Sequence, residues 1–292
     1  MSDTIITSRQ NSLIQHARAV REGKEKNLIF VEGLRLGEEA ARAGLDVEVA
    51  LYTAAFAAQE RGANLLRLLR PAAKRLQLIN EDVLGAISDT KTPQGVIIIA
   101  QRPDTSAAVL SRSQNDVPLV VIMHGVNNPA NAGAMLRVAE AAGASGIIST
   151  AGSTDLFSPK SLRGAMGSSF RLPVWDGTDL PAALHWCAAR GIRTISTSLQ
   201  ASQSHTEVDW TEPCAILVGA EAAGLSADEI ATTDLSIRIP MRPPVESLNV
   251  AAALAVILYE AERQRRGSRG RRQEAESGKQ EAGGREQQTE NI

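Results

Sequence analysis

Runs of consecutive apolar residues, separated by helix-like stretches, constrain the second half of this 292-residue chain more than any other feature. The runs at 119–123 (LVVIM) and 215–218 (AILV) contain no polar residue. Strands that are apolar on both faces are typical of a parallel sheet with helices on both sides. Further strands are predicted at 146–149, 192–198 and 235–239, and helices at 132–142, 159–166, 180–189 and 247–263. We therefore expect residues 118–264 to form an α/β domain with a parallel sheet.

The first 102 residues show the same alternation on a smaller scale. Strands are predicted at 27–31, 47–52, 75–79 and 95–100, and helices at 12–22, 34–43 and 63–70. This pattern predicts a smaller α/β domain over residues 1–102. Residues 103–117 mix Pro, Asp, Ser, Gln and Asn, so we expect them to link the two domains, with room for a short helix at 107–111.

The C-terminal residues 265–292 contain no large apolar side chain before Ile292. Such a segment buries too little surface to offset the entropy of ordering, so a disordered tail is expected. The tail contains a basic cluster of five arginines: Arg265, Arg266, Arg269, Arg271 and Arg272. A solvated tail and a loose phosphate-contacting arm both explain this cluster.

Composition excludes several classes of protein. No apolar run reaches the ~18 residues that span a bilayer, and the N-terminus lacks the basic-then-apolar pattern of a secretory signal. Two isolated cysteines, Cys187 and Cys214, exclude a disulfide scaffold and a Cys-rich metal site, so we expect no metal and a reduced, cytoplasmic protein. The net charge of −2 does not indicate a nucleic-acid binder, but local basic patches bind phosphates whatever the net charge.

The segment 124–137 (HGVNNPANAGAMLR) is the first candidate site. It follows a predicted strand and opens a helix, and open α/β sheets bind ligands at the carboxyl ends of their strands. Asn131 is a candidate helix cap or ligand contact, and Arg137 follows six residues later. In the alternative interpretation Asn131 only caps the helix, and Arg137 only pairs with Glu140 on the same helix face.

Two further segments follow strands or open helices. Lys160 and Arg163 share one face of a predicted helix, where they either hold a phosphate or face solvent. Gly219-x-Glu221-x-x-Gly224 follows an apolar run, so its glycines either admit a ligand to the backbone or merely serve the turn. A glutamate stands where the dinucleotide loop G-x-G-x-x-G has its second glycine, which argues against that kind of cofactor loop.

The segment 239–250 (IPMRPPVESLNV) passes from a strand through a Pro-rich loop into the long C-terminal helix. Ser247 is a suitable N-cap for that helix. Asn249 would lie in the first turn, where an asparagine in an otherwise apolar helix needs a partner for its amide.

Three of these segments together resemble the motifs of one enzyme family. Asn128-Pro-x-Asn131-x-Gly133-x-x-x-Arg137, Gly219-x-Glu221-x-x-Gly224 and Ile239-Pro-Met241 with Ser247-Leu-Asn-Val250 are similar, in residues and in order, to the three motifs of the SpoU (TrmH-type) RNA 2′-O-ribose methyltransferases of the SPOUT superfamily. Asn128 stands where relatives commonly carry an acidic residue. Pieces of the first block resemble the family's L30e-like α/β substrate-binding domain, namely Ile6-Thr-Ser with Asn11, Phe30-Val-Glu-Gly33 with Arg35, and Thr90-Lys-Thr-Pro-Gln-Gly95.

The resemblance implies a catalytic domain with a deep trefoil knot that binds S-adenosylmethionine. Carried over by position, the cofactor contacts would be Thr197, Leu199, Gly219, Ile239, Met241 and Leu248. The catalytic residues would be Asn131, Arg137, Glu221, Ser247 and Asn249. The family acts as homodimers, with the long C-terminal helix in the interface.

The implied reaction is methyl transfer to a ribose 2′-hydroxyl of structured RNA, with 23S ribosomal RNA favoured over transfer RNA. Arginine keeps its proton up to a pKa above ~12, so we assign Arg137 an electrostatic role: it would clamp a phosphate and stabilise the developing alkoxide. Candidate phosphate contacts are Arg9, Lys24, Lys26 and Arg35 in the first domain, and Lys160 and Arg163 in the second.

Two other classes of protein stay open. A dinucleotide-binding oxidoreductase is disfavoured because no G-x-G-x-x-G follows an early strand. A non-catalytic RNA-binding module with the same fold is disfavoured by the joint presence of Arg137, Glu221 and Asn249. Cofactor-binding and methyl-transfer assays separate the three alternatives.

Overall fold

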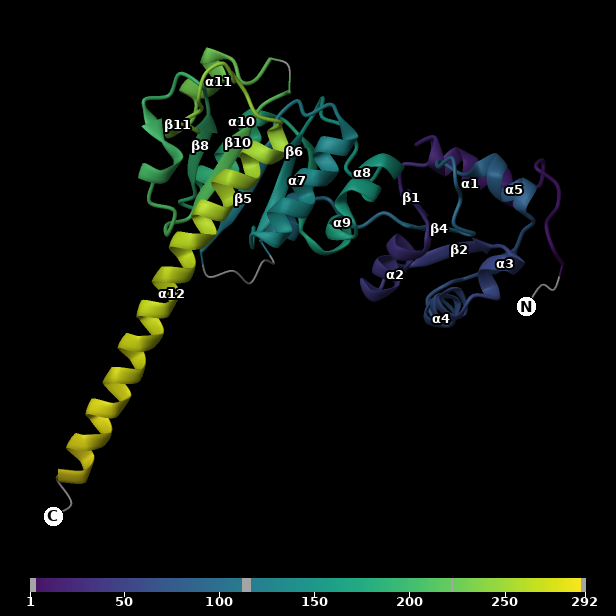
Figure 1. Cartoon of the computed structure of the whole chain (residues 1–292), viewed down its shortest axis with the longest axis horizontal. Coiled ribbons are helices and arrows are strands. Elements are labelled where there is room, and N and C mark those ends of the chain that lie inside the picture. The colour runs from purple at the N-terminus through teal and green to yellow at the C-terminus, as the bar shows by residue number, and fades with distance from the viewer. Residues whose placement is uncertain (1–3, 112–116, 222, 290–292) are drawn as a thin grey trace.

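Two α/β domains lie side by side, and a long C-terminal helix projects from the second (Figure 1). The computed structural model describes the backbone of residues 4–111, 117–221 and 223–289, and side chains up to residue 269. None of the helices in this described part of the chain combines the length and the apolar character needed to cross a membrane.

The first domain contains a four-stranded mixed sheet in the order β1-β4-β2-β3. Its strands are β1 (Leu28–Glu32), β2 (Val47–Tyr52), β3 (Leu76–Leu78) and β4 (Val96–Gln101). Its helices are α1 (Ser12–Arg21), α2 (Leu34–Arg42), α3 (Ala54–Ala57), α4 (Glu60–Leu69) and α5 (Glu81–Ile87). β4 pairs antiparallel with β1 and β2, whereas β2 and β3 are parallel. β4 is apolar from Val96 to Ala100, because Ile97 and Ile99 pack in the same core cluster as α1 and α5, and Ile98 in the cluster of α2 and α4.

The second domain contains a seven-stranded parallel sheet in the order β7-β6-β5-β10-β8-β11-β9. Its strands are β5 (Leu119–Met123), β6 (Gly146–Thr150), β7 (Val174–Thr178), β8 (Arg193–Thr197), β9 (Gln203–Ser204), β10 (Cys214–Val218) and β11 (Leu235–Arg238). Its helices are α6 (Ala107–Leu110), α7 (Pro129–Ala141), α8 (Pro159–Ala165), α9 (Ser168–Arg171), α10 (Leu180–Ala188), η1 (His205–Glu207), α11 (Ala227–Ala231) and α12 (Val250–Thr289). The predicted parallel sheet is confirmed, and its two central strands β5 and β10 are fully buried.

The strand order reverses between β5 and β10. β6 and β7 extend the sheet on the β5 side, and β8 and β11 extend it on the β10 side. The turns that follow the two central strands are in contact, since a Cβ at Gly125 would lie 3.6 Å from the Cβ of Ala220. Such a switch point is where open α/β sheets form a ligand crevice.

The start of α7 differs from the prediction. We expected a helix from residue 132 with Asn131 as its cap, but α7 begins at Pro129, and the Asn128 side chain accepts a hydrogen bond of 2.9 Å from the backbone N–H of Ala130. The reason is local, because proline is favoured at the first helical position, where its missing N–H is not needed. The side chain of Asn131 is therefore not used as a helix cap and is available for other contacts.

The expected disorder after residue 264 is contradicted at the start of that segment. Arg265 is buried, and its guanidinium donates to four backbone carbonyls, those of Val117 (2.7 Å), Pro118 (3.0 Å), Trp210 (2.7 Å) and Glu212 (2.9 Å). This arginine is fixed by partners far away in the chain, which composition cannot reveal. α12 continues as a helix to Thr289, and the side chains of Arg271 and Arg272 lie outside the described ones. In the expected linker α6 confirms the short helix, whereas residues 112–116 are not among those described.

Candidate active site

A cavity of about 900 Å³ lies at the carboxyl edge of the large sheet. Its walls are the turns that follow β8, β10 and β11, together with the beginning of α12. The residues predicted to contact a cofactor all border it: Thr197, Leu199, Gly219, Ile239, Met241 and Leu248. Of the predicted catalytic residues, the structure brings Asn131, Glu221, Ser247 and Asn249 to the same cavity.

The turn after β10 explains the glycines of the second motif. A Cβ at Gly219 would lie 2.5 Å from the carbonyl carbon of Gly224 and 2.7 Å from the backbone nitrogen of Leu225, so no side chain fits there. Gly224 has a φ of +65°, a left-handed conformation that favours glycine. Its N–H donates to the carbonyl of Ala220 at 2.9 Å, which folds the chain back on itself. The glycines therefore serve the turn and also bring bare backbone to the cavity wall.

A chain of hydrogen bonds joins the three sequence motifs. The Glu221 carboxylate accepts from the backbone N–H groups of Asn127 (3.3 Å) and Asn128 (3.2 Å) and from Nδ2 of Asn131 (3.1 Å). Oδ1 of Asn131 accepts from Nδ2 of Asn249 at 3.0 Å. Segments separated by 90 and 118 residues in the sequence thus meet at one amide.

The electrostatics of Glu221 follow from these contacts. Burial acts to raise the pKa of its carboxyl group, but the hydrogen bonds from Asn131 and from nearby backbone N–H groups outweigh burial, so the pKa lies below its ordinary value. Glu221 is consequently an anion at neutral pH and a poor proton acceptor. It places a fixed negative charge beside the cavity.

Asn249 takes the capping role that we predicted for Ser247. α12 begins at Val250, and Oδ1 of Asn249 accepts from the backbone N–H of Ala251 at 2.9 Å. The prediction of Ser247 as the N-cap is therefore wrong: it lies two residues before the cap, exposed at the cavity. The predicted need of Asn249 for an amide partner is confirmed, since Asn131 supplies it.

Arg137 lies on an exposed part of α7, outside the cavity lining. The alternative in which it merely pairs with Glu140 is excluded, because the Glu140 carboxylate is bound by Arg171 at 2.6 and 2.9 Å and by Ser168 at 2.6 Å. In the described part of the chain no ion pair holds the Arg137 guanidinium. It is thus a free cation on the same helix as Asn131.

Sequence reasoning missed a polar pair beside the cavity. The two ring nitrogens of His124 lie 2.9 Å from Oγ1 of Thr150 and 2.8 Å from Oε1 of Glu229. Glu229 also completes the capping box of α11 with Ser226, and α11 contributes Ala227 and Ile230 to the cavity wall. The sequence signal that could have indicated this pair is His124 itself, a polar residue directly after the apolar strand β5.

The basic residues predicted to contact RNA have different surroundings. Arg9, Lys26 and Lys160 are exposed, and Lys24 forms an ion pair of 2.7 Å with Glu22. The guanidinium of Arg163 forms an ion pair of 2.7 Å with Asp89 of the first domain. Arg35 borders a second cavity, in the first domain.

Metal ligands are not gathered anywhere in the described residues, where no group of three or more His, Cys, Asp or Glu side chains is arranged to hold a metal ion. Cys187 and Cys214 are both buried as free thiols.

Comparison with known proteins shows which family the chain resembles. The profile described as the SpoU rRNA Methylase family matches residues 118–259, and the MRM3-like substrate binding domain matches residues 11–98. An uncharacterised tRNA/rRNA methyltransferase of Synechocystis sp. is 34% identical, over 89% of this chain and 93% of that protein. The 23S rRNA (guanosine(2553)-2′-O)-methyltransferase RlmP of Bacillus subtilis is 29% identical, over 87% of this chain and 97% of the relative. The SpoU methyltransferase AviRb of Streptomyces viridochromogenes, solved in complex with AdoMet, superposes with a TM-score of 0.79 and 28% identity, covering 88% of this chain and 98% of AviRb.

Proposed function

This chain belongs to the SpoU family of S-adenosylmethionine-dependent RNA methyltransferases, and from that premise we propose that it methylates the 2′-hydroxyl of a ribose in ribosomal RNA, with 23S RNA as its substrate. The observation that carries the proposal is the hydrogen-bond chain Glu221–Asn131–Asn249, which joins all three motifs at one cavity. The match of the first domain to a substrate-binding domain supports a large, structured substrate.

The cavity fits S-adenosylmethionine in size and chemistry. Its volume of about 900 Å³ lies within the ~300–1,000 Å³ that is usual for small-molecule sites. Leu199, Ile239 and Met241 offer apolar walls for an adenine ring, and the bare backbone at Gly219 offers hydrogen-bonding groups. The carboxylates of Glu221 and Glu246 border the cavity and favour a sulfonium cation.

When bound there, S-adenosylmethionine supplies an electrophilic methyl group for in-line displacement by the ribose oxygen. Arg137 keeps its proton in any protein environment, so its role is electrostatic. Its position outside the cavity suits a phosphate next to the target ribose, and the same charge stabilises negative charge that develops on the 2′-oxygen. The hydroxyl proton passes to that phosphate or to water.

The remaining polar residues hold the ribose. Asn131 is fixed by Glu221 and Asn249, so its amide is preorganised without paying ordering entropy during the reaction. The Ser247 hydroxyl is exposed at the cavity and completes the polar pocket. Positioning of the nucleophile against the methyl group is then the main source of rate.

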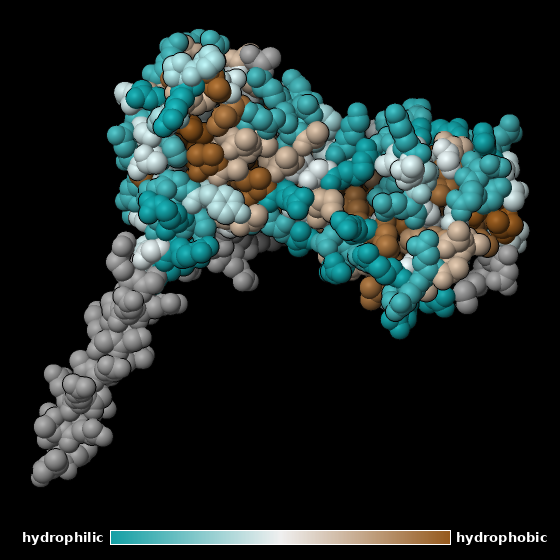
Figure 2. Space-filling model, in the orientation of Figure 1, coloured by the Kyte–Doolittle hydropathy of each residue, from teal (hydrophilic) through white to brown (hydrophobic). Residues whose placement is uncertain are grey.

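We also propose that the active protein is a homodimer that uses α12. Exposed apolar side chains occur on α12, at Val256 and Tyr259, and beside the cavity, at Leu199 and Leu248. Figure 2 shows hydrophobic residues gathered on the face of the catalytic domain that α12 crosses. The trefoil knot and the cytoplasmic location stay predictions from the family resemblance and from cysteine use.

The decisive assay is methyl transfer from tritiated S-adenosylmethionine to separated 23S, 16S and transfer RNA. After complete digestion to nucleosides, we expect the label in one 2′-O-methylnucleoside from 23S RNA. Label on a base would contradict ribose methylation. Label in transfer RNA alone would contradict the proposed substrate and leave the reaction type intact.

A further inference from the structure

The first domain has a cavity of its own, of about 440 Å³. It forms where three connections meet: the turn from β1 to α2, the turn from β2 to α3, and the loop of residues 88–95 that leads into β4. We call it the loop cavity. It is separate from the motifs that we related to catalysis and from the cavity at the carboxyl edge of the large sheet.

Glycines keep the loop cavity open. Oε1 of Gln94 accepts from the backbone N–H of Leu34 at 3.1 Å, and a Cβ at Gly33 would lie 2.9 Å from that oxygen. On the other side, a Cβ at Gly95 would lie 2.6 Å from the Cβ of Phe56. Gly33 and Gly95 have φ values of +97° and +84°. The floor of the cavity is therefore tightly built, and larger side chains at these positions would disrupt it.

The polar groups at the loop cavity include one free cation, two neutral amides and the exposed carboxylate of Glu81. Arg61 is neutralised, because its guanidinium donates to both carboxylate oxygens of Glu38 at 2.9 and 3.0 Å. Arg35 is exposed, and no ion pair engages it within the described residues. Gln59 and Gln94 supply the amides. RNA-binding proteins recognise unpaired bases through such donors and acceptors on the base edge and through arginine on the backbone.

We propose that the loop cavity binds one unpaired nucleotide of the ribosomal RNA, with Arg35 on its phosphate and Gln59 on the edge of its base. The proposal rests on the proposed function and adds a second contact on the same RNA, apart from the methylated ribose.

Thio-nucleotide cross-linking tests this directly. Ribosomal RNA substituted at random with 4-thiouridine or 6-thioguanosine is irradiated with the full-length protein, and the cross-linked peptides are mapped. We expect cross-links in the peptides that carry Phe56 to Gln59 or Pro93 to Gly95. Arg35→Ala should reduce their yield and raise the KM for RNA about tenfold, the effect of losing roughly one charged hydrogen bond. The KM for S-adenosylmethionine and kcat at saturating RNA should not change.

Arg67→Ala is the matched control. Arg67 is an exposed arginine on α4 of the same domain; its guanidinium donates to Oδ1 of Asn64 at 3.1 Å, and it does not border the loop cavity. If both variants change the KM for RNA equally, or neither does, the loop cavity is not a binding site. Because cross-linking needs no methyl transfer, a protein that cross-links here without methylating overturns the proposed function alone. A protein that methylates but cross-links elsewhere overturns the loop cavity alone.

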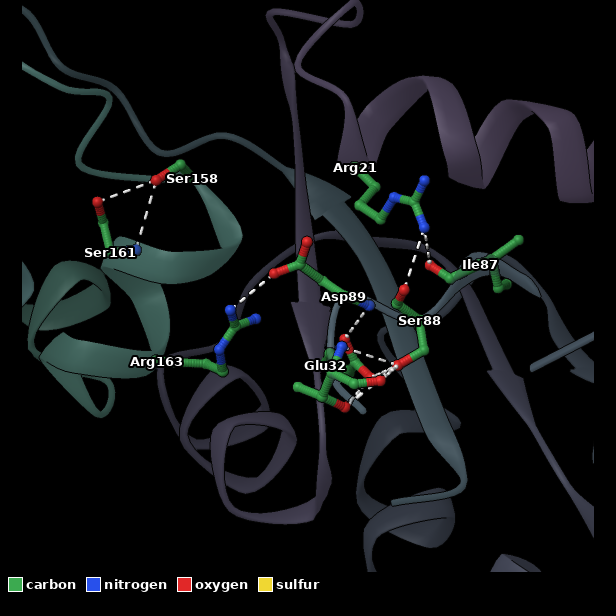
Figure 3. Close-up of polar contacts among 9 residues, drawn as sticks. Arg21, Glu32, Ile87, Ser88, Asp89, Ser158, Ser161 and Arg163 are labelled. Atoms are coloured by element: carbon green, nitrogen blue, oxygen red, sulfur yellow. Dashed lines mark hydrogen bonds and ion pairs between the residues drawn. The ribbon is translucent and has the colours of Figure 1, made fainter. Parts of the chain in front are cut away.

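A separate observation concerns how the loop of residues 88–95 is held. The buried Glu32 carboxylate on β1 accepts from Oγ of Ser88, from the backbone N–H of Asp89 (2.8 Å) and from Oγ1 of Thr90 (2.8 Å). Arg21 donates to the backbone carbonyls of residues 87 and 88, each at 3.1 Å. Figure 3 shows these contacts around the loop. The first residues of the loop are consequently held by side chains of β1 and α1.

The clamped loop directs the Asp89 carboxylate toward the other domain, where Arg163 of α8 binds it at 2.7 Å (Figure 3). α8 in turn is locked onto α7, since a Cβ at Gly133 would lie 2.4 Å from the carbonyl oxygen of Ser161. α7 carries Asn131 and Arg137. A series of short contacts thus connects the loop of residues 88–95, which borders the loop cavity, to α7.

We infer that Asp89 and Arg163 are positioning residues, which hold the RNA-docking domain in register with α7. A double-mutant cycle on kcat tests this with Asp89→Ala, Arg163→Ala and the double variant. Each single change should lower kcat several-fold, the double change should lower it no further, and the affinity for S-adenosylmethionine should stay constant. Arg163→Lys, which keeps the charge, should recover part of kcat.

Two outcomes would overturn the positioning role. One is additive losses of kcat in the double variant, which would show that the residues act independently. The other is unchanged kcat with a lowered melting temperature in both single variants, which would show that the ion pair only stabilises the fold.

Discussion

At the residue scale, Asn249 performs two tasks with one amide. Its oxygen caps α12 and its nitrogen fixes Asn131. The sequence predicted that this amide needs a partner, but not which one, because Asn131 lies 118 residues away. The same limit applies to Arg163 and Arg265: their partners lie 74 and up to 148 residues distant, so both looked like free surface cations.

Asn249→Asp separates the two tasks. A carboxylate still accepts from the helix N-terminus, so the free energy of unfolding should change by less than about 0.5 kcal/mol. It cannot donate to Asn131, whose amide would then lie between two carboxylates. We expect kcat to fall by roughly tenfold or more, the effect of about 1.4 kcal/mol. Asn80→Asp is the control, since Asn80 caps α5 in the same way, far from the site. Equal kcat in the two variants would contradict the role of Asn249.

The buried thiol of Cys187 predicts how the free energy of unfolding depends on pH. Burial raises the pKa of its thiol from the ordinary 9.0 to about 12. Folding thus favours the neutral thiol. Its contribution to the free energy of unfolding is complete below pH 9 and is lost as the pH rises from 9 toward 12. The loss should be about 1.4 kcal/mol per pH unit.

Urea unfolding of the wild type and of Cys187→Ala at pH 8, 9 and 10 measures this loss. Lysines and tyrosines titrate in both proteins and cancel in the difference. The stability advantage of the wild type should be constant up to pH 9 and shrink by pH 10. A difference that does not vary with pH would show that the thiol is not held neutral by burial.

At the element scale, most of the longer helices and strands were predicted from the sequence. The strands β2 and β5 match their predicted ranges: β5 is apolar and buried at every position, and β2 has four buried residues out of six. The short α3, α9 and β9 were not predicted, since two to four residues carry no periodicity, and the longer α5 and β7 were not predicted either. The start of α7 depended on one proline, and the close packing of α7 on α8 depended on glycines whose partners no local pattern identifies.

Gly133→Ala tests that packing. The new Cβ would meet backbone atoms at 2.4 and 2.8 Å, which cannot move aside as a flexible side chain would. We expect a loss of about 2 kcal/mol in the free energy of unfolding, and a lower kcat because α7 carries Asn131. Gly85→Ala is the control: nothing lies within 4 Å of its Cβ, and alanine should stabilise that helix by about 0.5–1 kcal/mol. Calorimetric melting of both variants decides, and no loss in Gly133→Ala would refute the close packing.

At the scale of the whole molecule, the two-domain division was predictable from the change of pattern near residue 102, but the interface was not. It depends on ion pairs such as Arg102 with Asp155 at 2.7 Å and with Asp176 at 3.0 Å, and on Arg171 with Glu39. One cluster of buried apolar residues also continues from Val31 of β1 to Leu162 of α8. Ion pairs and buried apolar side chains thus hold the domains together.

The proposed homodimer makes its own prediction. Val256→Glu places a charge on the exposed apolar face of α12, where Val256 is 40% exposed. Sedimentation equilibrium should give twice the mass of the chain for the wild type and a shift toward the monomer for this variant. Leu68→Glu, at a residue 55% exposed in the first domain, should stay dimeric. A wild type that is monomeric at micromolar concentration would rule out the dimer.

Arg137 serves the methyl transfer and takes no part in binding the donor. The most direct measurement pairs calorimetric titration of S-adenosylmethionine with single-turnover methyl transfer to 23S RNA, for the wild type and for Arg137→Ala. We expect equal donor affinity in both proteins and a transfer rate in the variant reduced at least a hundredfold, the size seen when one preorganised electrostatic group is removed. Near-normal transfer by Arg137→Ala, or a donor affinity lost along with the rate, would contradict the account.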